Sequence, residues 1–176
     1  MTDNGALVAV QHGLTRSPHW PTVEHHFLTA NPCCAASGLT KGVQAHHIAP
    51  FHFCILVGRP DLELYFPNLV PLSESEKGLS EVNYHLLLGH AGDFQSSNMD
   101  VLKAVMTFKG ATTDQIMTSS IWQAMKLSRC QPWAQWTNQQ KTDFRVLLDT
   151  LYPLPTGVSP EQHLALLVTD LTTRHS

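Results

Sequence analysis

The apolar runs in the first hundred residues are short and are interrupted by proline, which limits this part of the chain to short strands, short helices and turns. Val43–Phe53 has the composition of an extended segment. Two further short runs, Leu62–Phe66 and Leu69–Leu72, are broken by Pro67 and Pro71. Because proline lacks the N–H that a strand ladder needs, such runs predict short or edge strands and exclude a large sheet.

From Ser97 onward the pattern changes to helical spacing. Thr137-Asn-Gln-Gln140 is a capping box ahead of apolar residues at helical intervals, and Ser159 with Pro160 marks another helix start. Helices are expected over Thr22–Ala30, Val82–Leu88, Asn98–Lys109 and Thr113–Ser128 and after each of the two caps. The sequence therefore predicts an α+β protein with a C-terminal helical part.

Length and composition favour one globular unit. The chain has 176 residues, of which 43% are hydrophobic and 14% are charged, so a mostly disordered chain is excluded. The sequence contains no apolar run near the roughly 18 residues of a membrane span, and no basic signal region precedes Arg16. We therefore expect a cytoplasmic protein with no membrane partner. The four cysteines are too few and too unevenly placed for a disulfide framework, so reduced thiols are expected.

Charge is distributed unevenly along the chain. The first 100 residues carry nine acidic and four basic side chains, whereas the remaining residues carry five and seven. This balance excludes a basic protein that coats nucleic acid. Any attraction to DNA must therefore be local, and a bound cation or the more basic C-terminal part could supply it.

Histidine is the residue that points to chemistry. Nine of the 11 histidines precede residue 91, and imidazole both titrates near neutrality and binds transition metals. His46 and His47 are adjacent in the segment predicted to be extended. Neighbouring side chains in a strand point to opposite faces, so these two cannot both bind one metal ion in regular geometry. We expect one to be a ligand and the other to act as a base.

Six segments between Arg16 and Val101 form a recognisable series: Arg16–Val23, Asn31–Gly38, Ala45–His52, Gly58–Leu64, Pro67–Leu72 and Asn83–Phe94. Together they resemble the HNH endonucleases, in the subgroup with a His-His…Asn…His arrangement. The resemblance implies a ββα-metal (His-Me finger) core in residues 16–101. The weak patterning of residues 1–15 predicts a flexible arm, and the helical spacing after Ser97 predicts a helical extension in residues 102–176.

The resemblance also implies roles for individual residues. His46 and His85 would hold one divalent metal ion. His90 is a weaker candidate ligand, because it lies five residues after His85 and not the four that place two ligands on one helix face. His47 would be the general base, and Asn68 would brace the loop that orients it. The expected activity is hydrolysis of DNA to a 5′-phosphate and a 3′-hydroxyl, with Mg²⁺ as the expected ion and Mn²⁺, Ni²⁺ or Zn²⁺ as alternatives. A homodimer is compatible with this interpretation.

Two further features bear on that interpretation. Arg59 is a candidate phosphate contact, although Asp61 or Glu63 could equally be its partner. A Cys-x-x-Cys pair of the family is here Cys34-Ala-Ala-Ser37, which puts a structural zinc site in doubt. Two alternatives remain open: a degenerate HNH-like module that binds nucleic acid or a protein without cutting, and a metal-dependent hydrolase of another substrate.

Overall fold

The structure, a computed structural model, describes residues 14–74 and 82–173. The predicted arm at residues 1–15 therefore lies almost entirely outside the described residues. The helices and strands are α2 (Trp20–Ala30), β1 (Val43–His47), α3 (Phe51–Leu56), β2 (Leu69–Ser73), α4 (Val101–Thr107), α5 (Thr113–Met117), α6 (Ser120–Arg129), α7 (Asn138–Leu151) and α8 (Pro160–Thr173). The predicted α+β class is confirmed.

The sheet consists of β1 and β2, which pair antiparallel with a register that runs from Val43 opposite Ser73 to His47 opposite Leu69. The predicted extended segment ends at His47, earlier than expected. Pro50 precedes the first turn of α3, and its carbonyl accepts the backbone N–H of Cys54 at 3.1 Å. The prediction of extended chain through Phe53 is therefore wrong, because the fixed φ of Pro50 suits a helix start as well as a strand end.

The segment between α3 and β2 forms turns and not the strand predicted there. Two short 3-10 helices, Pro60–Glu63 and Phe66–Asn68, occupy it. Each has a proline in its first turn, where the missing N–H costs nothing. Leu62–Phe66 was expected to be extended because of its apolar content. Apolar content alone does not distinguish a strand from a buried turn.

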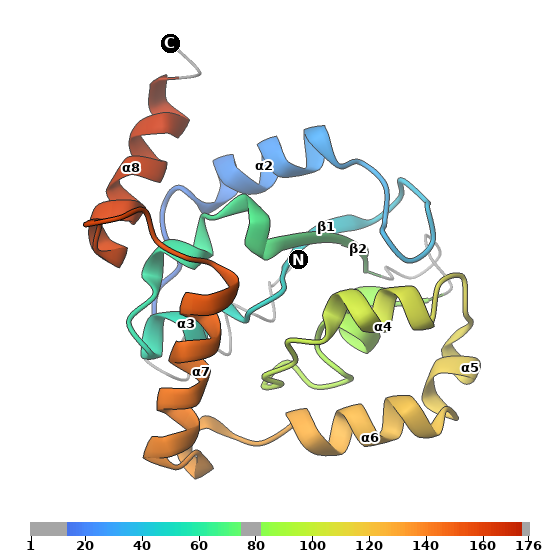
Figure 1. The fold of residues 1–176 in the computed structure, drawn as a ribbon. Coiled ribbons are helices and arrows are strands. Elements are labelled where there is room, and N and C mark those ends of the chain that lie inside the picture. Colours follow the sequence, from blue (N-terminus) through green and yellow to red (C-terminus); the bar gives the residue numbers. More distant parts are fainter. Residues whose placement is uncertain (1–13, 75–81, 174–176) are drawn as a thin grey trace.

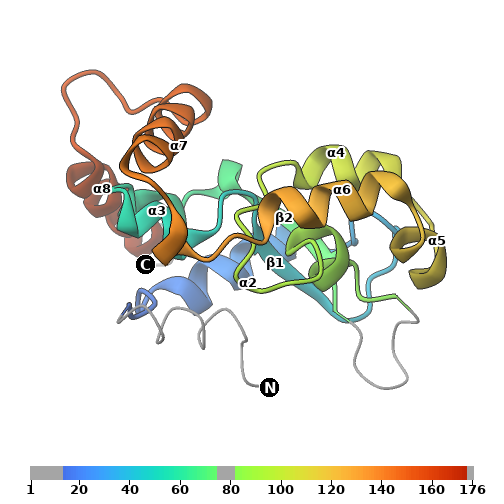
Figure 2. The ribbon, with the colours of Figure 1, turned by 90° about the horizontal axis from the view of Figure 1, so that it is seen from below.

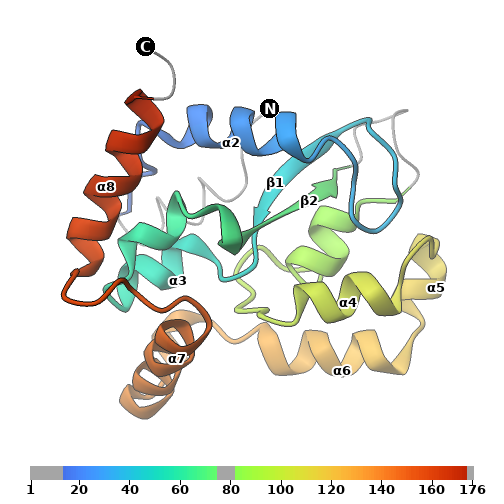
Figure 3. The same cartoon turned by 45° about the horizontal axis from the view of Figure 1, so that its top comes forward.

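The helical part packs into the same cores as the rest of the chain. Figures 1 and 3 place α4, α5 and α6 on one side of the sheet and α7 and α8 on the other, and Figure 2 shows the same separation from below. Trp122 of α6 is buried in one cluster with Val70 and Leu88. Phe144 of α7 lies in a second cluster with Phe53. The residues that carry the predicted site are thus enclosed by helices from later in the chain.

The predicted helix starts are present. The side chains of Thr137 and Gln140 exchange hydrogen bonds with each other's backbone N–H groups, as a capping box requires. The helix expected over Thr113–Ser128 is instead divided into α5 and α6 at Thr118. The backbone of Ser119 is extended, with φ −70° and ψ 129°, which separates α5 from α6 and makes Ser119 the N-cap of α6.

No helix in the described part of the chain has the length and apolar character needed to cross a membrane.

Leu148→Ala is expected to lower the free energy of unfolding by about 2–4 kcal/mol, because Leu148 is fully buried between Phe53 and Phe144 and its removal leaves a cavity. Leu147→Ala, one residue earlier on α7 and 41% exposed, is the matched control and should cost much less. Urea unfolding followed by tryptophan fluorescence measures both. Equal losses of unfolding free energy in the two variants would show that α7 does not pack as described.

Candidate metal centre

Three histidines converge on one face of the β1–β2 pair. His46 projects from β1, and His85 and His90 lie at the two ends of a short turn that follows β2. One ring nitrogen from each lies within 4.8 Å of the other two. The ring centroids are 5.0 Å apart for His46 and His85, 4.7 Å for His46 and His90, and 5.0 Å for His85 and His90. This cluster could hold one metal ion.

The turn that carries His85 and His90 is a π-helix, His85–Gly89, in which the N–H of His90 donates to the carbonyl of His85 at 3.2 Å. A separation of five residues would place the two rings on different faces of an α-helix, whereas the wider π turn brings them together. The indole of Trp122 fixes this turn by donating to the Leu87 carbonyl at 2.8 Å. The geometry therefore makes His90 as well placed as His85.

Gly89 leaves the space that the His46 ring occupies. A Cβ at this position would lie 2.7–2.9 Å from three atoms of the His46 ring. Any larger residue would push the ring away from His85 and His90. A glycine at the end of the π turn is therefore a steric requirement of the cluster.

The surroundings of the cluster keep its imidazole rings uncharged, which is the form that binds a cation. Burial, followed by the charges of neighbouring histidines, lowers the pKa of His46 and of His90 well below the usual value of 6.5. Both rings are therefore neutral at pH 7 and carry a free lone pair. The buried Nε2 of His46 and Nδ1 of His90 have no hydrogen-bond partner in the part of the chain that the structure describes. Buried polar atoms are nearly always satisfied, so these nitrogens fit a metal ion.

Glu74 was not identified from the sequence. Its Oε2 lies 3.5 Å from Nδ1 of His85, and this contact lowers the pKa of Glu74. Glu74 directly follows β2, and its N–H donates to the carbonyl of Gly42 at 2.8 Å, which fixes it beside the cluster. A carboxylate here can orient the imidazole of His85 or serve as an oxygen ligand. The sequence shows only that Glu74 follows the apolar run Leu69–Leu72; the pairing of β2 with β1 brings it to the cluster.

His47 lies on the opposite face of β1, as alternation along the strand predicts. Its ring contacts Trp20, with centroids 4.5 Å apart, and its Nε2 lies 2.9 Å from the carbonyl oxygen of Glu63. A carbonyl only accepts, so Nε2 carries the proton and the lone pair resides on Nδ1. Burial and the nearby charge of Arg16 lower the pKa of His47 well below its usual value. A neutral ring with one fixed N–H can accept a proton at Nδ1.

Asn68 is fully buried and braces the loop between β1 and β2. Its Oδ1 accepts the N–H of Ala49 at 2.7 Å, and its Nδ2 donates to the carbonyls of Ala49 and Leu62 at 3.1 and 3.0 Å. Leu62 precedes the residue whose carbonyl fixes His47. The contact between Asn68 and the predicted base is therefore indirect and runs through the backbone.

Arg59 does not lie where a phosphate could reach it. It is 0% exposed, and its guanidinium donates to both carboxylate oxygens of Asp61, each at 2.9 Å, and to Asp149 at 2.8 Å. The prediction that Arg59 binds phosphate is therefore wrong, and its alternative partner Asp61 is the observed one. Arg16 is the cation near the histidines, with its guanidinium 4.6 Å from the ring centroid of Trp20 and 4.2 Å from that of Phe51.

The cysteine segment shows no sign of a thiolate zinc site. Burial raises the pKa of Cys34, but hydrogen bonds with Ser37 and Ser73 outweigh it and lower the pKa overall. Within residues 14–74 and 82–173, the three histidines form the one group that could hold a metal ion. The surroundings of Cys34 are those of a buried thiol packed against two hydroxyls.

Comparisons with known proteins assign no family to this arrangement. No family model, curated protein or solved structure matches the chain. The chemistry of the site must therefore be argued from its residues.

His46→Ala should weaken the binding of Zn²⁺ or Ni²⁺ by at least about 100-fold, because it removes one of three converging nitrogens. His47→Ala should leave the affinity close to that of the unaltered protein, since its ring lies on the other face of β1. Isothermal titration calorimetry of EDTA-treated protein measures both. An equal loss of affinity in the two variants would contradict the separation of the two rings.

The metal-free protein should lose stability as the pH falls below about 6.5. The folded-state pKa values of His46 and His90 lie below their unfolded values, so the unfolded chain binds more protons in acid. Each such histidine can contribute a slope of at most about 1.4 kcal/mol per pH unit. Urea unfolding in EDTA between pH 7.5 and 5.5 tests this, with a shallower slope expected for His46→Gln. The exposed His25→Gln, a control on α2, should keep the original slope.

Proposed function

We propose that the protein is a metal-dependent endonuclease of the ββα-metal type that hydrolyses DNA phosphodiester bonds. The observation that carries the proposal is that the adjacent residues His46 and His47 of β1 point to opposite faces and have different surroundings. His46 joins a buried three-histidine cluster, while His47, on the other face, has its Nε2–H fixed on a carbonyl and its Nδ1 lone pair available. Such a pair of a cation site and a neutral base is what hydrolysis of a phosphodiester requires.

The donor atoms favour a nitrogen-binding divalent ion. His46, His85 and His90 each offer an imidazole nitrogen, which suits Zn²⁺, Ni²⁺ or Fe²⁺. Mg²⁺ prefers oxygen ligands at octahedral positions, so the expectation of Mg²⁺ fits this set less well, unless Glu74 and substrate oxygens complete it. When bound, the ion would neutralise charge on the phosphate and on the departing oxygen.

The protein's own residues supply the proton transfer. Nδ1 of His47 takes a proton from a water molecule that attacks phosphorus. The bond from phosphorus to the 3′-oxygen breaks, and the departing oxygen takes a proton from solvent, which leaves a 5′-phosphate and a 3′-hydroxyl. The Glu63 carbonyl holds the ring in the tautomer that this step needs. Asn68 holds the backbone beside that carbonyl.

Arg16 takes the place first assigned to Arg59 as the phosphate contact. Burial is the main cause that lowers the pKa of His46, His47 and His90, and the charge of Arg16 lowers the pKa of each further. The two aromatic rings beneath its guanidinium hold it by cation–π attraction. A local cation of this kind offsets the acidic balance of the first hundred residues.

The test is nicking of supercoiled plasmid by purified protein in the presence of Zn²⁺, Ni²⁺, Mn²⁺ or Mg²⁺, each compared with EDTA. His47→Ala should reduce the nicking rate by about 10²–10⁴-fold while retaining metal affinity. His25→Ala, on the exposed face of α2, is the matched control. Nicking that survives His47→Ala would remove the assigned base. Tight metal binding without nicking in any metal would instead support the module that binds without cutting.

A further inference from the structure

Three consecutive residues of the turn Pro60–Glu63 are fastened to different parts of the chain. The side chain of Asp61 pairs with the helical part, the carbonyl of Leu62 accepts from Asn68 at 3.0 Å, and the carbonyl of Glu63 lies 2.9 Å from Nε2 of His47. The carbonyl that fixes the predicted base is therefore placed by the two residues before it.

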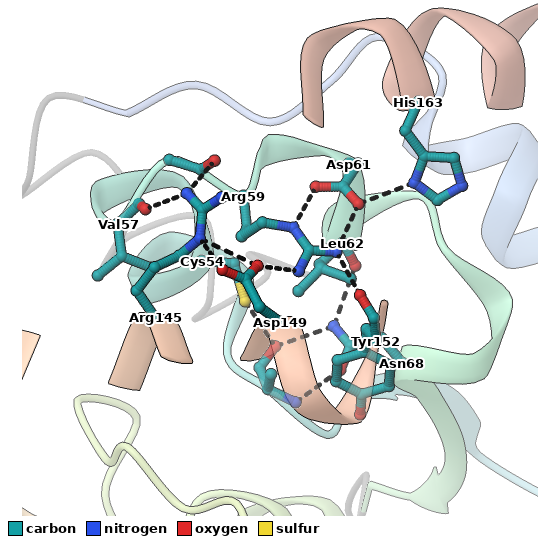
Figure 4. Close-up of polar contacts among 12 residues, drawn as sticks. Cys54, Val57, Arg59, Asp61, Leu62, Asn68, Arg145, Asp149, Tyr152 and His163 are labelled. Atoms are coloured by element: carbon teal, nitrogen blue, oxygen red, sulfur yellow. Dashed lines mark hydrogen bonds and ion pairs between the residues drawn. The ribbon is translucent and has the colours of Figure 1, made fainter. Parts of the chain in front are cut away.

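The fastening at Asp61 is a buried ion-pair network (Figure 4). Arg59 and Asp61 form a two-point pair with both side chains 0% exposed. Oδ2 of Asp61 also lies 2.9 Å from Nδ1 of His163 in α8, and a carboxylate only accepts, so His163 donates. From α7, Asp149 accepts from Arg59 at 2.8 Å, and the Tyr152 carbonyl just after α7 accepts at 2.9 Å.

Apolar contacts also dock the C-terminal helices. Phe144 and Leu148 already pack α7 against Phe53, and Leu164 and Leu167 pack α8 against the cluster of Trp20 and Leu64. A buried ion pair pays a large desolvation cost and contributes less to stability than apolar side chains of the same size. Its clearest physical effect is to fix direction, since two-point pairing of a guanidinium with a carboxylate allows one arrangement.

We propose that Arg59, Asp61 and His163 are positioning residues for the base. Their contacts link the turn Pro60–Glu63 to α8, hold the Glu63 carbonyl against Nε2 of His47, and so select the Nε2–H tautomer of that ring. The catalytic consequence rests on the proposed nuclease function, whereas the structural link from α8 to the tautomer of His47 does not. The helical part thereby contributes to the site without touching substrate.

Replacement of His163 tests the link in the full-length protein. His163→Leu removes the donor to Asp61 and keeps a side chain of similar size. His163→Asn restores an N–H near the position of Nδ1 and should rescue. Leu167→Ala is the matched control, because it weakens the packing of α8 without a bond to Asp61. If His163→Leu fails to fold, Asp149→Ala gives a second, milder break, since this carboxylate is 46% exposed.

Two measurements separate positioning from simple destabilisation. Two-bond ¹H–¹⁵N spectra of the histidine rings in metal-free protein, with His47 assigned from its loss in His47→Ala, report the tautomer. We expect the Nε2–H form in the unaltered protein, His163→Asn and Leu167→Ala, and a mixture of both tautomers in His163→Leu. In plasmid nicking, kcat of His163→Leu should fall by about tenfold with KM nearly unchanged.

The outcomes distinguish this inference from the proposed function. A folded His163→Leu or Asp149→Ala protein with the original tautomer and the original kcat would overturn the positioning role, even if the protein is a nuclease. A similar change of tautomer in Leu167→Ala would also overturn it, because loosened packing would then suffice. A tautomer change confined to the network variants, in a protein that cuts no DNA, would support the link and remove the nuclease proposal.

Discussion

The antiparallel register of β1 and β2 determines everything that the site can do. With His47 opposite Leu69, the pleat sends His46 toward the π turn and His47 toward Trp20. A shift of one residue would exchange the two faces and place the base among the ligands. The register is set where the strands meet the connecting loop, because Asn68 bonds both the N–H and the carbonyl of Ala49. One buried amide thus fixes the relation between the predicted base and the predicted cation site.

Much of this arrangement follows from the sequence by elementary rules. Alternation along a strand separated His46 from His47 without any structural information. Helical spacing and capping residues located α7 and α8, and Thr137 caps as its side chain requires. These features depend on neighbours within a few residues, which is the range over which sequence patterns are informative.

What the sequence did not predict depends on distant partners. Arg59 was assigned to phosphate with Asp61 as an alternative partner, and its further bond to Asp149, which lies 90 residues away, could not be foreseen. His90 was ranked below His85 on α-helical spacing, whereas the observed turn is a π-helix stabilised by the indole of Trp122. The role of Glu74 depends on the pairing of β2 with β1. In each case tertiary contacts override the local rule, and no pattern within one segment contains that information.

Helices α7 and α8 supply partners to the buried side chains of Arg59 and Asp61, and this limits how the chain can change during evolution. A segment that ended near residue 101 would keep all three cluster histidines. It would, however, leave the guanidinium of Arg59 and the carboxylate of Asp61 without the partners from α7 and α8 that now enclose them. The region that contains the cluster histidines therefore cannot be moved to another protein unchanged. Transfer to another scaffold would require new counterparts for those charges, or their joint replacement by apolar side chains.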